Sequence, residues 1–141
     1  MTARSDLIRS LMTKSTTLRR HVIKMMWYGG GGHIGGSLSC VDIITALYFH
    51  TLRIDPHRPN WDDRDRFILS KGHAAATLYA ALAERGFFPK ERLLDSFRNN
   101  VNGFLQEHPD MKRVPGIDVS TGSLGQGLSV AVGLALSLIH I

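Results

Sequence analysis

Apolar residues in the first 28 positions recur every three or four residues, which is the spacing of an amphipathic helix. This apolar face consists of Leu7, Leu11, Leu18, Val22 and Met25. The pattern predicts a helix over about residues 3 to 28. It should end at the run of four glycines that begins at Gly29, because glycine is a common helix stop.

Further helices are predicted by the same spacing and by capping residues. Ser37 or Ser39 is suited to cap a helix over about residues 40 to 52. A helix from about Ala74 to Arg85 should end at Gly86. Pro89, a residue favoured in the first helical turn, predicts a helix that includes the segment PKERLLDSF. A last helix, rich in glycine and alanine, is expected from about Leu124.

One segment alone is typical of a strand. RFILS, residues 66 to 70, is short and apolar and is bounded by charged residues and by Lys71 and Gly72. Residues 98 to 122 form a long irregular segment, and loops of that length are usually functional or disordered. The predicted order of helices and a strand along the chain favours an α/β fold, but a single strand cannot form a sheet. We therefore expect the incomplete start of an α/β domain, mostly helical with one clear strand.

Composition excludes several classes of protein. The chain has 141 residues and a formal net charge of +5, with the cations concentrated in the first predicted helix. No aromatic-rich or recognisable nucleic-acid-binding motif accompanies them, so a solvated helix face is expected and no nucleic-acid partner. Cys40 is the only cysteine, which excludes a disulfide framework. The apolar runs are shorter than the about 18 residues of a membrane span, and the polar start is unlike a signal peptide, so a cytoplasmic protein is expected.

Candidate chemistry is concentrated in three histidines that lie beside glycine or proline. His33 stands in GGHIGG, His73 in SKGHAA and His108 in QEHPD. They are 40 and 35 residues apart, which is far from the short spacings of local metal sites, so no metal ligand is predicted. An imidazole in such a loop can bind an anion or exchange protons near neutral pH.

Three segments of the chain resemble transketolase. They are GHIGGSLSCVDIITALYF, WDDRDRFILSKGHAAATLYAALAERGFF and PGIDVSTGSLGQGLSVAVGLAL. The motif TGSLGQG begins 48 residues after His73, and the resemblance extends from about residue 4 to Ala135. The similarity is strongest to the amino-terminal subunit of split transketolases, in which the enzyme is made of two chains.

This resemblance implies a three-layer α/β/α domain that binds thiamine diphosphate. It implies that His33 and His108 are catalytic residues at the substrate and that His73 contacts the diphosphate of the cofactor. Gly122, Ser123 and Leu124 would lie against the aminopyrimidine through main-chain groups.

The implied activity is transfer of a two-carbon ketol unit from a ketose phosphate to an aldose phosphate, a reaction of the pentose phosphate pathway. Magnesium or calcium would assist, with ligands beyond this chain. The implied partners are sugar phosphate substrates and a carboxy-terminal subunit or domain, in a homodimer or heterotetramer, with no membrane partner.

Two departures from the transketolase pattern bear on substrate preference. Ile34 occupies a position where many relatives have proline, and Glu107 replaces a common glycine before His108. The Glu107 carboxylate could change the proton affinity of that imidazole or point into solvent. The alternatives are 1-deoxyxylulose-5-phosphate synthase or another thiamine-diphosphate enzyme, and a non-enzymatic basic helical interaction module.

The final hexapeptide, LSLIHI, departs from the family pattern. It is the translation of a common transposon-end sequencing adapter, CTGTCTCTTATACACATC. We therefore expect residues 1 to 135 to be the amino-terminal part of the diphosphate-binding domain and residues 136 to 141 to be a non-native tail. As a fragment with uncovered apolar surface, the isolated chain is expected to be inactive and poorly soluble.

Overall fold

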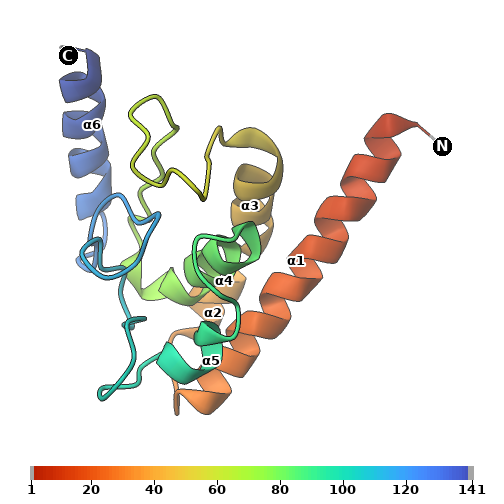
Figure 1. Cartoon of the computed structure of the whole chain (residues 1–141), viewed down its shortest axis with the longest axis vertical. Helices are drawn as coiled ribbons and strands as arrows, with labels where there is room; N and C mark the ends of the chain where they lie inside the picture. The colour runs from red at the N-terminus through yellow and green to blue at the C-terminus, as the bar shows by residue number, and fades with distance from the viewer. Residues whose placement is uncertain (1, 140–141) are drawn as a thin grey trace.

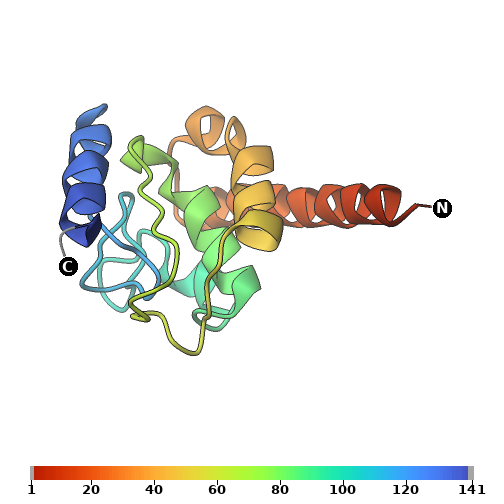
Figure 2. The ribbon, with the colours of Figure 1, turned by 90° about the horizontal axis from the view of Figure 1, so that it is seen from above.

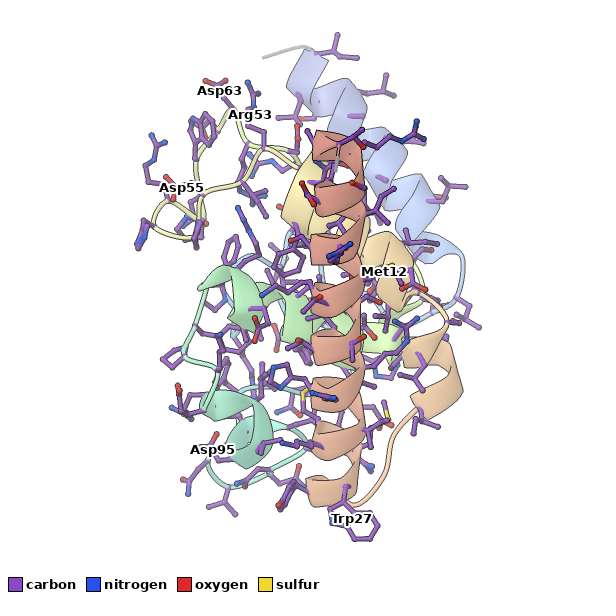
Figure 3. All side chains as sticks on the ribbon, turned by 90° about the vertical axis from the view of Figure 1, so that its right-hand side faces the viewer. Met12, Trp27, Arg53, Asp55, Asp63 and Asp95 are labelled. Carbon is purple, nitrogen blue, oxygen red and sulfur yellow. The ribbon has the colours of Figure 1, made fainter. Side chains whose placement is uncertain are left out.

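The structure is a computed structural model that describes residues 2–139. Its longest element is α1, Ala3–Tyr28, which matches the predicted first helix. The Thr2 side chain accepts a hydrogen bond from the Ser5 N–H and caps this helix. Figure 2 shows α1 as a rod whose N-terminal part extends beyond the other helices. At its other end Trp27 is 82% exposed and points away from them (Figure 3).

Two short helices follow α1, and the sequence pattern predicted only one of them. α2 spans Ile34–Leu38, within the segment expected to be a glycine-rich loop. α3 spans Val41–Ala46 and continues as the π-helical turn η1, Leu47–Thr51. The predicted cap at Ser37 or Ser39 was wrong, because Ser37 lies inside α2 and Cys40 precedes α3.

α4, Ala75–Arg85, forms the centre of the molecule. It follows the 3-10 turn η2, Gly72–Ala74, and ends at Gly86, whose φ of 91° suits glycine. Helices α1, α2, α3 and α5 all contact it, so its residues from 75 to 83 are buried without interruption. The predicted helix was confirmed here. α5, Arg92–Ser96, begins later than the helix predicted from Pro89, whose first residues form a turn.

Buried ion pairs fasten α4 to α1. The Glu84 side chain is 5% exposed and its carboxylate contacts Lys14 Nζ at 2.8 Å, His21 Nε2 at 3.1 Å and Lys90 Nζ at 3.2 Å. Burial alone would raise the pKa of Glu84, but hydrogen bonds from these three groups outweigh it and lower the pKa to about 2. The carboxylate is therefore charged at neutral pH. Its partners are Lys14 and His21 on α1 and Lys90, which follows α4 in the chain.

The predicted strand at residues 66 to 70 was wrong for this chain. This segment runs without regular secondary structure, and the one bridge in the described residues joins Phe97 to Leu105. A strand needs a neighbour for its backbone N–H and C=O groups, and no neighbouring strand lies within residues 2–139. The Phe67 N–H instead donates to the Asp118 carboxylate, at 2.9 Å.

The last helix, α6, spans Gln126–Ile139 and begins two residues later than predicted. It lies on the opposite side of the molecule from α1 (Figure 1). A cavity of about 340 Å³ separates it from the 64–68 segment, and Gly127 is its only buried residue. The expected tail at 136–141 continues this helix as far as Ile139, while His140 and Ile141 lie outside the described residues.

Candidate cofactor and substrate site

His33 and His73 meet at the N-terminal ends of two helical segments. His33 immediately precedes α2 and His73 lies in η2, yet their ring centroids are 5.1 Å apart in an edge-to-face arrangement. The glycines after α1 make this possible, because Gly30, Gly31 and Gly32 have φ values of 70°, 141° and 140°. L-residues with a side chain rarely adopt such angles, so these glycines let the chain turn sharply from α1 into α2.

A second glycine keeps the backbone of α2 close to the His73 ring. A Cβ atom on Gly36 would lie 2.7 Å from both Cδ2 and Nε2 of His73. Lys71 Nζ donates to the Gly36 carbonyl oxygen and to Ser39 Oγ, both at 2.7 Å. Thr77 Oγ1 donates to the Ser37 carbonyl oxygen, also at 2.7 Å. These bonds satisfy carbonyls at the end of the short helix and hold it against the His73 turn.

His108 approaches the same region from the long irregular segment. A Cβ atom on Gly122 would lie 3.6 Å from His108 Cδ2. The hydroxyl of Tyr79, a fully buried residue of α4, donates to the His108 carbonyl oxygen at 2.7 Å. Burial also raises the pKa of Tyr79. The backbone of the 108 loop is thus anchored in the core while its imidazole stays exposed.

The pKa of His73 is lowered by its surroundings. Partial burial lowers the pKa of His73 below its ordinary value. Electrostatic interactions with His33, Lys71 and His108 lower the pKa of His73 further. The imidazole is therefore neutral at pH 7 and can donate one hydrogen bond and accept another.

Glu107 faces the site and not the solvent alone. Its Oε1 lies 3.5 Å from His33 Nε2, and the two side chains are 36% and 53% exposed. The sequence pointed to an influence on the adjacent His108, whereas the carboxylate contacts the imidazole 74 positions earlier in the chain. The sequence could not reveal this contact, because it depends on how the 108 loop folds over α2.

Gly122, Ser123 and Leu124 form an exposed loop before α6. The preceding residue, Thr121, packs against η2 so closely that a Cβ on Gly72 would lie 2.4 Å from its carbonyl oxygen. Lys71 and Thr121 were not singled out from the sequence. Their position beside Gly72 and within TGSLGQG was the available indication, because glycine often marks a close backbone approach.

The structure thus places His33 beside His73 and His108 beside Gly122, and the contact of Glu107 with His33 joins the two pairs. Ser123 and Leu124 follow Gly122 in the chain and are exposed. Within residues 2–139, no group of three or more histidine, cysteine or acidic side chains is arranged to hold a metal ion. No helix in the same range is long and apolar enough to cross a membrane.

Comparison with known families decides what kind of domain this is. A family model described as "Transketolase, thiamine diphosphate binding domain" matches residues 12–139. The chain belongs to the transketolase family.

Individual transketolases show how much of the family's length is present. The chain is 49% identical over 128 residues to the 6-deoxy-6-sulfo-D-fructose transketolase subunit of Clostridium sp. strain MSTE9. It is 41% identical over 130 residues to an apulose-4-phosphate transketolase subunit of Phocaeicola vulgatus. These matches cover 91% and 92% of this chain but 46% and 45% of the relatives. The chain spans less than half of their length.

Solved transketolases share its fold. The enzyme of Pichia stipitis in complex with sedoheptulose 7-phosphate superposes with a TM-score of 0.82 at 34% identity, over 89% of this chain and 18% of that one. The Campylobacter jejuni transketolase gives 0.79 at 35% identity, over 89% and 19%. This similarity confirms the expected fold class, an incomplete transketolase α/β domain that is mostly helical in this chain.

Proposed function

We propose that this chain supplies the histidine-bearing half of a thiamine diphosphate site in a transketolase. The complete enzyme would transfer a two-carbon ketol unit from a ketose phosphate to an aldose phosphate. The observation that carries the proposal is the contact of the His33 and His73 rings, 5.1 Å apart, beside the bare backbone of Gly36. The match to the transketolase thiamine diphosphate binding domain supports it and favours it over a basic interaction module.

The residues present suit the cofactor. A neutral His73 can donate a hydrogen bond to a diphosphate oxygen, and Gly36 and Gly122 leave backbone beside the imidazoles uncovered by a side chain. Gly122, Ser123 and Leu124 are exposed and could meet an aromatic ring through main-chain groups. Bound thiamine diphosphate supplies carbanion chemistry that a protein side chain cannot provide. A divalent metal would take its ligands from outside residues 2–139.

The chain's own residues would bind the substrate and manage its protons. We assign His33 and His108 as catalytic residues that donate hydrogen bonds to substrate oxygens as negative charge develops there. Glu107, 3.5 Å from His33, keeps that ring in one orientation and adds a negative charge at the entrance. This charge should affect which anionic sugars are accepted, in line with the substrate differences in the names of the two relatives.

The assembly and location follow from the relatives. Both are named as transketolase subunits, which supports a carboxy-terminal partner subunit, in a heterotetramer or, if the two parts are fused, a homodimer. We place the enzyme in the cytoplasm, and its sugar phosphate chemistry in the pentose phosphate pathway. We further propose that residues 1–135 are native domain sequence and that the last six residues are an adapter read-through, which the parent DNA would reveal.

The test uses the full-length gene product together with its partner subunit. Calorimetry should show binding of thiamine diphosphate with magnesium, and the pair should complement a transketolase-deficient strain. His73→Ala should weaken cofactor binding at least about tenfold, the loss expected for a hydrogen bond to a charged group. His57→Ala, in an exposed loop outside the site, is the matched control and should bind normally. If the wild-type pair neither binds the cofactor nor complements the strain, the proposal fails.

A further inference from the structure

The loop that leads into Gly122 is fixed by one buried carboxylate. The Asp118 side chain is 5% exposed and accepts a hydrogen bond from Arg64 Nη2 at 2.5 Å. Its other oxygen accepts the Phe67 backbone N–H at 2.9 Å, and Arg66 Nη1 lies 3.8 Å away. The Arg64 side chain is itself only 8% exposed. A carboxylate this deeply placed is retained only where its partners compensate its charge.

A second hydrogen bond joins the 118–121 segment to the 67–69 segment. Thr121 Oγ1 donates to the Leu69 carbonyl oxygen at 2.6 Å, two residues beyond the Phe67 N–H that Asp118 holds. Backbone groups two residues apart lie on the same edge of an extended segment. The 118–121 segment is therefore bonded along one edge of the segment that precedes η2.

This attachment bears directly on the site. The 67–69 segment leads to Gly72 and His73, and Thr121 leads to Gly122. The two meet where Gly72 packs against the Thr121 carbonyl oxygen. A change in the Asp118 contact would thus shift Gly122, Ser123 and Leu124 relative to the His73 ring.

We propose that Asp118 is a positioning residue for the thiamine diphosphate site. By holding Arg64 and the Phe67 N–H, its carboxylate fixes the 122–124 loop against His73 and so sets the affinity for the cofactor. This inference rests on the proposed function. Among residues 2–139, the hydrogen-bond and ion-pair partners of Asp118 are Arg64, Arg66 and the Phe67 N–H, so it acts on the site through Thr121 and Gly72.

The principal variant is Asp118→Asn in the full-length gene product, produced together with its partner. Asparagine keeps the shape and one acceptor oxygen but removes the charge that compensates Arg64. The dissociation constant of thiamine diphosphate, measured by calorimetry, should rise about tenfold, as for the loss of a charge-assisted bond. The kcat at saturating cofactor should change less than about threefold, because the catalytic groups remain. Asp118→Glu, which keeps the charge, should restore most of the affinity.

The matched control is Asp95→Asn. Asp95 pairs with Arg92 on α5 but is 61% exposed and lies outside the site, so cofactor affinity should not change. Backbone hydrogen exchange without cofactor provides a readout of loop position. In Asp118→Asn the amides of residues 121 to 124 should exchange faster than in the wild type, while those of α4 should not.

The outcomes separate the two proposals. A wild-type protein that binds no thiamine diphosphate refutes the proposed function, whatever the exchange experiment shows. A wild type that binds, together with a folded Asp118→Asn variant of equal affinity, refutes only the role of Asp118. If that variant does not fold, Arg64→Lys tests the role of Asp118 instead. Lysine keeps the positive charge but lacks the planar, two-pronged donor geometry of the guanidinium group. The cofactor dissociation constant of Arg64→Lys should rise at least about threefold, and an unchanged value would overturn the inference.

Discussion

Helices α4 and α6 are both short, apolar and rich in small residues, yet they have opposite surroundings. Residues 75 to 83 of α4 are all buried, whereas in α6 only Gly127 is. α4 is contacted by four other helices and ends in the Glu84 ion pairs. α6 has no charged residue and lies beside an irregular segment. An apolar helix sequence predicts that the helix will be buried, but the residues that bury it belong to other elements of the chain.

One face of α6 carries a row of exposed apolar side chains. Leu128 is 69% exposed, Val132 54% and Leu136 52%. Exposed apolar residues in such a row usually mark an interaction surface or a liability to aggregation. The expected low solubility of the isolated chain has its physical basis here.

The largest difference in the free energy of unfolding is expected when an aspartate is introduced into each of the two helices. Ala80 in α4 is fully buried, so Ala80→Asp should lower the free energy of unfolding by more than about 4 kcal/mol, because an unpaired charge is buried. Val132→Asp in α6 should change it by less than about 0.5 kcal/mol in this chain. Urea unfolding followed by circular dichroism checks both. Equal effects would show that α6 is as well covered as α4.

A smaller effect is expected at the ion pairs that fasten α4. Glu84→Gln should lower stability by about 2 kcal/mol, since Lys14 and Lys90 lose their charged partner and His21 loses a charged hydrogen-bond partner. The pKa of Glu84 is about 2 in the folded protein and 4.5 ordinarily, so its contribution is complete above pH 4.5 and disappears as the pH falls toward 2. The wild type should therefore lose its advantage over Glu84→Gln in that window, as measured by unfolding at a series of pH values.

The control for Glu84 is a surface ion pair that also involves α1. Asp42 on α3 pairs with Arg19 at 2.7 Å but is 74% exposed. Asp42→Asn should cost at most about 0.5 to 1 kcal/mol, because exposed pairs contribute little. A cost as large as that of Glu84→Gln would mean that burial is not what distinguishes the two pairs.

The last comparison is between two glycines within α6, where the two substitutions should act in opposite directions. A Cβ on Gly127 would lie 2.7 Å from Ser70 Cα, so Gly127→Ala should push α6 away from the segment before η2 and cost about 1 to 2 kcal/mol. Gly133 has no atom within 4 Å of that position, and Gly133→Ala should stabilise the helix by up to about 1 kcal/mol. Thermal unfolding of the two variants checks the signs. Stabilisation by Gly127→Ala would show that α6 does not depend on this contact.

Much of the fold and of the site was predictable, and the failures share a cause. The bounds of α1 and the end of α4 at Gly86 depend on neighbouring residues, so local spacing and glycine were sufficient. The segment at 66–70 has a strand's composition but no partner within the described residues, and its Phe67 N–H binds Asp118, 51 positions away. The glycine-rich α2 was missed because its carbonyls are satisfied by Lys71 and Thr77.

The sequence by itself determined the long helices, the three histidines and the resemblance to transketolase, because these follow from local periodicity and from motifs. Only the tertiary structure decided that His33 contacts His73, that Glu107 faces His33 and that Asp118 binds Arg64 and the Phe67 N–H. Each of these contacts joins residues at least 40 positions apart, and the packing of α2, η2 and the 108 loop around α4 brings them together. Such distances are set by the core as a whole, and no local pattern in the chain encodes them.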